Sequence, residues 1–519
     1  MVIPSRLPLL IVAVWLCLAS AAFAQHDAHR NATQAIADGD LKKAEKQLSQ
    51  ADEGDPETQF VQMMLALKRG DTAAAVERAE KAMGAGLPFS RLAAGPRDLL
   101  APLYATERFK ALAAKHADLW LVHGPMVGAV TDTTAAIWVR TAKAARVEVR
   151  IGDKTYGPSP STAASDYTAV VKLDGLRPAT KHEYLVLIDG RPAKVEHAAV
   201  TTYPEAGQPG RFSVAFGGGA GFVPQWERMW DTIRGVRPAA MLMLGDNVYI
   251  DQPTHLLCQH YCYYRRQSRP EWRRLVATTP IYAIYDDHDF GTNDCVPGPQ
   301  IETPPWKRVV WNTFRQNWVN PAYGGGQRQP GCWFDFHIGD VHFILLDGRY
   351  YRDRKGGSML GPVQKAWLLK TLGESKAAIK VLASPVPWTE GIKPGSKDPW
   401  DGFPEERESI FRFIETNSIK GVFLIAADRH RTDLRTTARP GGYDLYEFES
   451  SRLTNRHTHG VVKTPGLIWG YNKTCSFALM HFDTAAAAPH VDFECITIDG
   501  DVVHRHRLPL SALRRPRKE

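Results

Sequence analysis

The sequence predicts an α/β protein in which two smaller domains precede the domain that carries the candidate site. Between residues 205 and about 450, short apolar, strand-like runs alternate with helix-like segments, which is typical of a layered α/β fold. Three of these runs end in acidic side chains, accompanied by phenol or imidazole groups. Because strand ends in such folds gather at one edge of a sheet, we expect these side chains to lie together.

Length and composition agree with a globular protein of several domains. The chain has 519 residues, of which 44% are hydrophobic and 23% are charged, and its formal net charge is +8. The positive charge is scattered, apart from a basic tail at 511–519. The sequence therefore predicts no specific nucleic-acid binding.

Residues 1–24 have the pattern of a secretory signal peptide. Arg6 precedes an apolar run at 7–20, and Ala22–Ala24 resembles a cleavage site for small side chains. The apolar run is short for a membrane span. We expect an exported mature protein, periplasmic or secreted, without a membrane span; an uncleaved anchor is the alternative.

Six cysteines follow this segment, and an even number in an oxidising compartment predicts disulfides. Cys475 and Cys495 lie in neighbouring strand-like runs, so we expect them to pair. Cys258, His260 and Cys262 have a spacing that matches no common zinc motif, which favours a disulfide or buried thiols over a metal site.

Residues 25–117 are expected to be helical, because Ala, Glu, Lys and Leu dominate and apolar positions recur at helical spacing. The sequence that begins at Gly39 recurs at Gly70, an offset that resembles tetratricopeptide helical hairpins. A plain helical hairpin is the alternative. Two copies are too few for a free-standing array, so we expect residues 29–115 to pack on the next domain or to bind a protein partner.

Residues 118–204 change to the period of two that β-strands require. Runs at 136–140, 147–151 and 167–173 alternate, and the pattern resembles a fibronectin type III or immunoglobulin-like sandwich with Tyr184 near its corner. No catalytic motif occurs in this stretch. We interpret it as a packing or spacer domain.

Residues 205–510 form the α/β domain itself. Strands are expected at 212–216, 240–244, 281–285, 342–346, 379–383 and 421–426. Helices are expected near 225–234, 306–317, 361–372 and 405–416. The end of the chain, from about 443, is rich in strand-like runs and should extend the same core.

The charged strand ends of this domain have the composition of a metal site. Asp246 and Tyr249 follow one strand, Asp287 and His288 a second, and Asp428 with His430 a third. Such mixed ligands suit iron, manganese or zinc, and an all-oxygen site suits Ca²⁺. Paired metals stabilise the attacking and leaving oxygens in displacement at phosphorus. A single Asp after a strand is often a cap or turn residue, but three such ends in one domain argue against coincidence.

Four motifs occur in order along the chain: GDNVY at 245–249, DDHD at 286–289 followed by Asn293, LDGRYYR at 346–352 and ADRH at 427–430. Together they resemble the alkaline phosphatase D (PhoD-like) branch of the metallophosphoesterases, over roughly residues 120–455. The resemblance implies a four-layer α/β/β/α core behind a fibronectin III/Ig-like sandwich. It also implies an exported, metal-dependent phosphoric ester hydrolase, a phosphomonoesterase or a phosphodiesterase.

The resemblance further implies roles for the site residues. A metal-activated hydroxide would attack phosphorus in line, and His288, oriented by Asp289, would act as acid or electrostatic stabiliser. The cofactors would be Fe³⁺ plus Ca²⁺, with Mn or Zn as alternatives. The implied ligands are Asp246, Tyr249, Asp287, Asn293, Asp428 and His430.

Arg349 and Arg429 are candidates for binding the phosphate of a substrate, because the guanidinium fork matches phosphate oxygens. For Arg349 the alternative is an ion pair with Asp347. For two further groups of residues, the sequence allows either a place in the lining of a pocket or ordinary packing or solvation. They are Trp388 with Trp400, and Asn455 with His457 and His459.

The main departure from the family lies in the first turn of the α/β domain. Where the family has a cysteine, this chain has a glycine-rich turn at 216–221, with Gly219 at or near that position. Such a turn either offers backbone N–H groups to a phosphate or serves as a tight turn only. The changes at Asp289, Gly348 and Ala427 are milder. If a metal has been lost, the alternative is a non-catalytic binding protein that acts through its helical repeats.

Overall fold

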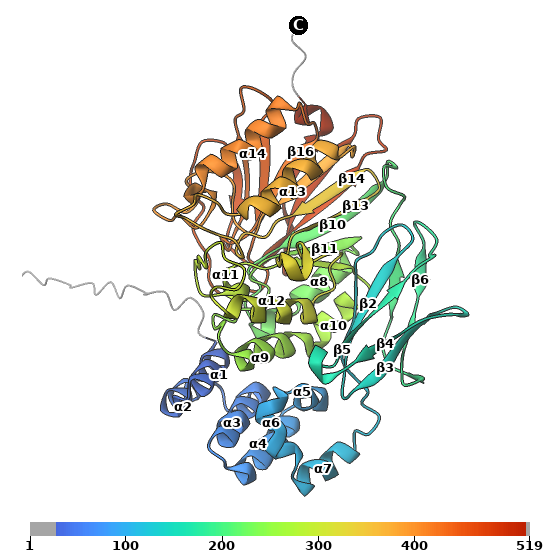
Figure 1. Cartoon of the computed structure of the whole chain (residues 1–519), viewed down its shortest axis with the longest axis vertical. Coiled ribbons are helices and arrows are strands. Elements are labelled where there is room, and N and C mark those ends of the chain that lie inside the picture. Colours follow the sequence, from blue (N-terminus) through green and yellow to red (C-terminus); the bar gives the residue numbers. More distant parts are fainter. Residues whose placement is uncertain (1–26, 515–519) are drawn as a thin grey trace, which may run out of the picture.

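The structure, a computed structural model, describes residues 27–514 (Figure 1). The predicted signal peptide and residues 515–519 of the basic tail lie outside the described residues. The described chain combines helices with several sheets, so the prediction of a mixed α/β protein is confirmed. No helix within residues 27–514 is long and apolar enough to cross a membrane.

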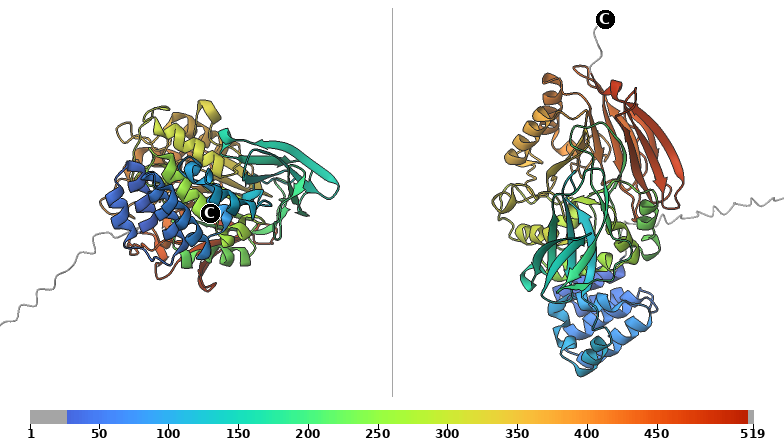
Figure 2. Two further views of the ribbon diagram at one scale, coloured as in Figure 1. Left: turned by 90° about the horizontal axis from the view of Figure 1, so that it is seen from below. Right: turned by 90° about the vertical axis from the view of Figure 1, so that its right-hand side faces the viewer.

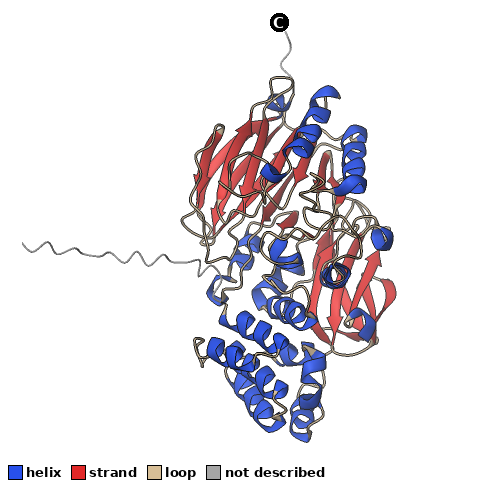
Figure 3. Cartoon of the chain, turned by 60° about the vertical axis from the view of Figure 1, so that its left-hand side comes forward, coloured by secondary structure: helices blue, strands red, loops and turns tan. Residues whose placement is uncertain are grey.

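The N-terminal region of the described chain consists of helices and forms one end of the molecule (Figures 1 and 3). Its helices are α1 (Ala28–Asp38), α2 (Leu41–Leu48), α3 (Pro56–Lys68), α4 (Thr72–Gly84), α5 (Phe89–Ala94), α6 (Arg97–Tyr104) and α7 (Glu107–Ala114).

The recurring Gly-Asp pair marks the turn inside each helical hairpin. Gly39 and Gly70 both have φ of 81°, the left-handed conformation that glycine adopts without penalty. The next residues, Asp40 and Asp71, each accept a backbone N–H bond and so cap α2 and α4. The repeated sequence thus corresponds to two equivalent turns, α1–α2 and α3–α4.

The helical region is attached to the large domain through buried charged groups. On α9 (Leu256–Gln267), Arg265 pairs with Asp27, and the Tyr261 hydroxyl donates to Glu57 at 3.1 Å. These contacts fix the helices against the domain that carries the candidate site.

Residues 121–201 form small antiparallel sheets (Figure 2). One has the order β1-β2-β5, one the order β4-β3-β7-β8, and β6 pairs with β9. The strands are β1 (Leu121–Gly128), β2 (Ala135–Thr141), β3 (Ala145–Ile151), β4 (Lys154–Ser161), β5 (Thr168–Leu173), β6 (Lys181–Glu183), β7 (Leu185–Ile188), β8 (Arg191–Pro192) and β9 (Ala199–Thr201). The Tyr184 hydroxyl donates to the Ala277 carbonyl at 2.9 Å, so this tyrosine joins the small sheets to the large domain.

The large domain contains two sheets. The first has the order β12-β11-β10-β20-β21-β22, in which β10, β11 and β12 are parallel. Its strands are β10 (Arg211–Gly217), β11 (Ala240–Leu244), β12 (Ile281–Ile284), β20 (Ser476–Asp483), β21 (His490–Thr497) and β22 (Val502–Pro509).

The second sheet has the order β13-β14-β15-β16-β18-β17-β19, and its central strands β14, β15, β16 and β18 are parallel. Its strands are β13 (Phe334–Ile338), β14 (Val341–Leu345), β15 (Ile379–Ala383), β16 (Val422–Ala426), β17 (Thr432–Thr437), β18 (Leu445–Ser450) and β19 (Leu467–Tyr471). The predicted strands of the α/β domain are therefore confirmed.

Aromatic side chains fill the space between the two large sheets. Phe482 on β20 contacts Phe343 on β14 and Phe423 on β16, with ring centroids 5.6 and 6.4 Å apart. Helices α13 (Gly361–Glu374) and α14 (Pro404–Thr416) cover the other face of the second sheet, where Leu368 and Ile410 share a core with Leu382. The remaining helices lie beside the first sheet (Figure 1): α8 (Met229–Gly235), α9, α10 (Pro270–Val276), α11 (Asp287–Phe290) and α12 (Trp306–Asn317).

The predicted Cys475–Cys495 disulfide is wrong, since both residues are free thiols. Cys495 lies opposite Ala478 in the β20–β21 ladder, whereas the Cys475 carbonyl accepts from Ile498. The two cysteines are therefore three ladder positions out of register, about 10 Å at the rise of a β-strand. A disulfide needs Cα atoms closer than roughly 7 Å. Cys258 and Cys262 are buried thiols on α9.

We expect thiol titration of the denatured, unreduced mature protein to count six free thiols, because all six cysteines of the described chain are unpaired. Cys475→Ser should lower the count to five. If Cys475 were paired in the wild type, the count would start at four or fewer and the substitution would release its partner.

Candidate metal and phosphate site

Strand ends from both large sheets bring the predicted acidic residues together. Asp246 follows β11 and Asp287 follows β12, and these two strands are parallel neighbours. Ligand atoms of Asp246, Asp287 and His288 lie within 4.8 Å of one another. His430, which follows β16 of the facing sheet, has Nε2 3.8 Å from Asp246 Oδ2.

Tyr249 occupies the centre of the contacts between Asp246 and His430. Its hydroxyl donates to Asp246 Oδ2 at 3.0 Å and lies 2.8 Å from His430 Nε2. Asn455 Nδ2 donates to the same hydroxyl at 2.6 Å. One carboxylate, one phenol and one imidazole thus converge, a donor set that suits iron or a similar transition metal.

Backbone strain accompanies three of the site residues. Asp246, Asp428 and His430 have φ of 52°, 76° and 47°, the left-handed region that is disfavoured for residues with a Cβ. Strain of this kind concentrates at functional sites, where the surrounding fold holds it in place.

Buried acceptors at the site fit cations. Among the described residues, Asp246 Oδ1 and Asp428 Oδ2 are buried without a hydrogen-bond partner. Burial raises the pKa of Asp246 well above its ordinary value; the charge of His288 opposes this shift, and the charges of Asp287 and Asp286 add to it. A buried carboxylate needs a cationic partner, so the residues present fit one or more metal ions.

His288 is oriented by Asp251 and not, as predicted, by Asp289. His288 Nδ1 is hydrogen-bonded to Asp251 Oδ1. Asp289 instead accepts the backbone N–H groups of Asn247 at 3.1 Å and Val248 at 2.8 Å, and burial raises its pKa to about 7. The sequence interpretation missed Asp251 because a loop carboxylate after the GDNVY motif has no distinctive spacing.

Asp251 also links the site to the N-terminal helices. Its second carboxylate oxygen accepts from Arg30 of α1 at 2.7 Å, and both side chains are largely buried. Burial alone would lower the pKa of His288, but the charges of Asp287, Asp251 and Asp246 raise it well above its ordinary value. The three carboxylates thus favour the charged form of the imidazole.

Arg349, predicted to bind substrate, is committed to carboxylates. It is fully buried, makes a two-pronged contact with Asp398 at 2.6 and 3.1 Å, and donates through Nε to Asp286. The suggested partner Asp347 accepts only its backbone N–H. Arg429 differs, because its Nη1 lies 3.6 Å from Asp428 Oδ2 and its Nε has no hydrogen-bond partner in the described chain.

The surroundings of Asp428 contain a lysine that the sequence interpretation missed. Lys393 Nζ lies 2.8 Å from Asp294, 3.5 Å from Asp398 and 3.9 Å from Asp428. Asn293, predicted as a ligand, is exposed, whereas its neighbour Asp294 lies within 4.8 Å of ligand atoms of Asp287 and Asp398. No motif signals Lys393, which comes from the loop after β15.

The glycine-rich turn after β10 has no room for a thiol ligand. Gly219 has φ of 64°, and a Cβ there would lie 1.9 Å from the Ser451 carbonyl oxygen. The N–H groups of the turn donate to backbone carbonyls, Gly219 to Gly245 at 3.3 Å and Ala220 to Asp246 at 2.8 Å. These bonds favour the tight-turn interpretation over phosphate binding.

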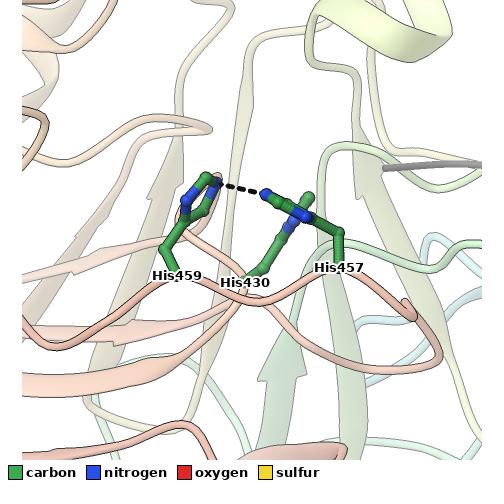
Figure 4. A group of neighbouring side chains, drawn as sticks. All are labelled: His430, His457 and His459. Atoms are coloured by element: carbon green, nitrogen blue, oxygen red, sulfur yellow. Dashed lines mark hydrogen bonds between the residues drawn. The ribbon is translucent and has the colours of Figure 1, made fainter. Parts of the chain in front are cut away.

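The two groups that the sequence left undecided, the tryptophan pair and the histidine loop, lie in different places. Trp388 and Trp400 are fully buried and stacked, with ring centroids 4.4 Å apart, so they pack in the core of the second sheet. His457 and His459 lie against His430 (Figure 4), and ligand atoms of the three imidazoles are within 4.8 Å of one another. Burial lowers the pKa of His459 to about 3.

Two sheets with helices beside them and acidic residues at the strand ends form an α/β domain of the kind that binds ligands at the carboxyl ends of its strands. The profile described as PhoD-like phosphatase matches residues 214–465, so this part of the chain is a PhoD-like phosphatase domain. Residues 118–206 match a domain of unknown function, DUF7800.

Two similar proteins carry related names. Alkaline phosphatase D of Bacillus subtilis (strain 168) is 31% identical over 185 residues, which are 30% of this chain and 31% of that protein. The chain thus matches about a third of the length of this curated relative. A solved structure titled "Structure of PhoD" aligns with a TM-score of 0.56 and 16% identity, over 74% of this chain and 92% of that one, which shows a shared fold.

Restoring a cysteine at position 219 should destabilise the protein rather than complete a ligand set. Gly219→Cys combines a left-handed backbone, which costs about 1–3 kcal/mol, with overpacking against Ser451, which adds roughly as much. We expect the free energy of unfolding, from denaturant titration, to fall by about 3 kcal/mol or more.

Gly190→Cys is the matched control, because Gly190 has φ of 76° but nothing within 4 Å of an added Cβ. That variant should lose only about 1 kcal/mol. Equal losses in the two variants would contradict the steric explanation.

Proposed function

We propose that the protein is an exported, metal-dependent phosphoric ester hydrolase that acts on phosphomonoesters or phosphodiesters. The observation that carries the proposal is the convergence of Asp246, Asp287 and His288 with Tyr249 and His430 in a PhoD-like domain. We interpret the two large sheets with their helices as a four-layer α/β/β/α metallophosphoesterase core. The small sheets in front of it correspond to the fibronectin III/Ig-like sandwich.

The donor set supports two metal ions. Asp246, Tyr249 and His430 would hold one of them, and the phenol favours Fe³⁺. Asp428 and Asp287 would hold the second, for which Ca²⁺ suits the oxygen ligands; Mn or Zn are alternatives. Bound metals would supply an acidified water molecule and neutralise charge on the phosphoryl oxygens.

His288 is the group that the chain offers to the leaving oxygen. Its Nδ1 is bonded to Asp251, which leaves Nε2 as the ring atom that carries a transferable proton. Arg429 is the stronger of the two predicted arginines for contacting phosphate, because its Nε has no hydrogen-bond partner among the described residues and its Nη1 lies near Asp428.

A pocket of about 280 Å³ supports access to this site from the helical side. Tyr249 and Asn455 line this pocket together with Arg456 and the α1 residues His29 and Arg30. The N-terminal helices therefore shape the approach to the site, in addition to any protein partner they bind. Export is supported by the signal-peptide pattern at 1–24.

The central test is hydrolysis by purified mature protein. Metal-free protein should gain activity on p-nitrophenyl phosphate or bis-p-nitrophenyl phosphate when Fe, Mn, Zn or Ca is restored. Asp246→Asn should lower kcat/KM by more than about 100-fold, because even loss of partners of metal ligands costs about 10–100-fold.

Asp501→Asn, in the exposed turn between β21 and β22 and far in sequence from Asp246, is the matched control and should behave as wild type. Absence of turnover with every metal, together with absence of bound metal, would favour the non-catalytic binding protein.

Asp251→Asn tests the positioning of His288. The amide cannot stabilise a charged imidazole as the carboxylate does, so we expect kcat to fall by about 10–100-fold with little change in KM. Asp251→Glu should recover part of the loss.

The control for Asp251→Asn is Asp38→Asn. It removes the charge of an exposed contact between α1 and His255 and should leave kcat unchanged. Equal kcat values for Asp251→Asn and wild type would show that His288 does not depend on Asp251.

A further inference from the structure

The loop after β18 places two histidines beside His430, although neither belongs to a motif (Figure 4). The Nε2 atoms of His457 and His459 lie 3.1 Å apart. Their ring centroids are 5.4 and 5.6 Å from that of His430. Three imidazoles from two separate segments thus surround one small volume.

Hydrogen bonds hold this arrangement at several points. The His457 backbone N–H donates to Asn455 Oδ1 at 2.9 Å, and the Thr458 hydroxyl donates to the His430 carbonyl at 2.9 Å. Asn472 Nδ2 donates to the His459 carbonyl at 3.0 Å. The loop is therefore tied both to the His430 segment and to the strand end after β19, which preorganises the three rings.

A second observation points to a ligand. His430 is 5% exposed, and its Nδ1 is buried without a hydrogen-bond partner among the described residues. Its Nε2 already contacts Tyr249. A buried ring nitrogen without a partner is costly, and a bound cation satisfies it.

We propose that His430, His457 and His459 together bind a transition-metal ion of the Zn²⁺ class. Three neutral imidazoles prefer Zn²⁺, Co²⁺ or Ni²⁺ to Ca²⁺ or Mg²⁺, and three histidines leave a coordination position open. The inference rests on the proposed function and deepens it. Because a neutral imidazole ligates one metal ion, an ion held by His430, His457 and His459 would take the place of the first ion proposed above. The inference also accounts for a site whose glycine turn cannot carry the thiol of the family.

The test uses the full mature protein after chelation and dialysis, titrated with Zn²⁺ by calorimetry and checked by elemental analysis. Wild type should bind one equivalent of Zn²⁺ per chain with high affinity. His457→Asn combined with His459→Asn should weaken that equivalent on the order of 100-fold or more. His197→Asn, at an exposed histidine outside the cluster, should bind as wild type.

Unchanged affinity and stoichiometry in the double variant would overturn the proposal. Melting temperatures in chelator report whether the double variant folds, and the single variants His457→Gln and His459→Gln replace it if it does not. Zinc binding is read without substrate. A protein that binds Zn²⁺ through these histidines but hydrolyses no ester would refute the proposed function and leave this site standing.

Discussion

The burial of carboxylates at strand ends is the constraint on which the rest of this structure depends. Asp246, Asp286, Asp287 and Asp289 are all nearly inaccessible to solvent, and a buried carboxylate is unstable unless it is paired or hydrogen-bonded. Three kinds of partner stabilise these carboxylates or can do so. Arg349 pairs with Asp286, backbone N–H groups bind Asp289, and Asp246 retains an acceptor that fits a cation. Neighbouring acidic residues therefore differ in their surroundings: Asp286 and Asp289 have protein partners, whereas Asp246 has an acceptor without a partner among the described residues.

The same constraint joins the N-terminal helices to the site. The carboxylates around His288 raise the pKa of its imidazole, and one of them, Asp251, also pairs with Arg30 of α1. Since Arg265 and Tyr261 of α9 contact Asp27 and Glu57, the helices are fixed at the edge of the site. The helical region, which the sequence predicts to pack on the next domain or to bind a partner, thus contributes to the contacts that hold the His288 imidazole.

Close packing limits which side chains can enter the part of the site next to Gly219. The turn at Gly219 runs so close to Ser451 that a side chain cannot be accommodated. The neighbouring loop supplies Asn455 to Tyr249, and His457 and His459 to His430. Close backbone approach at the turn and imidazole donors in the loop therefore occur together, which supports nitrogen rather than sulfur ligands for the ion proposed here.

The sequence alone determined the mixed α/β class, the strands that end in Asp246, Asp287 and Asp428, and the limits of α12, because these depend on local periodicity and composition. It also indicated the family through motifs of adjacent residues. Only the tertiary structure decided the partner of His288, the burial of Arg349 and the position of Lys393. It likewise decided the register that keeps Cys475 from Cys495. Each of these depends on segments far apart in the chain, whose distances are set by sheet order and packing and leave no local signal in the sequence.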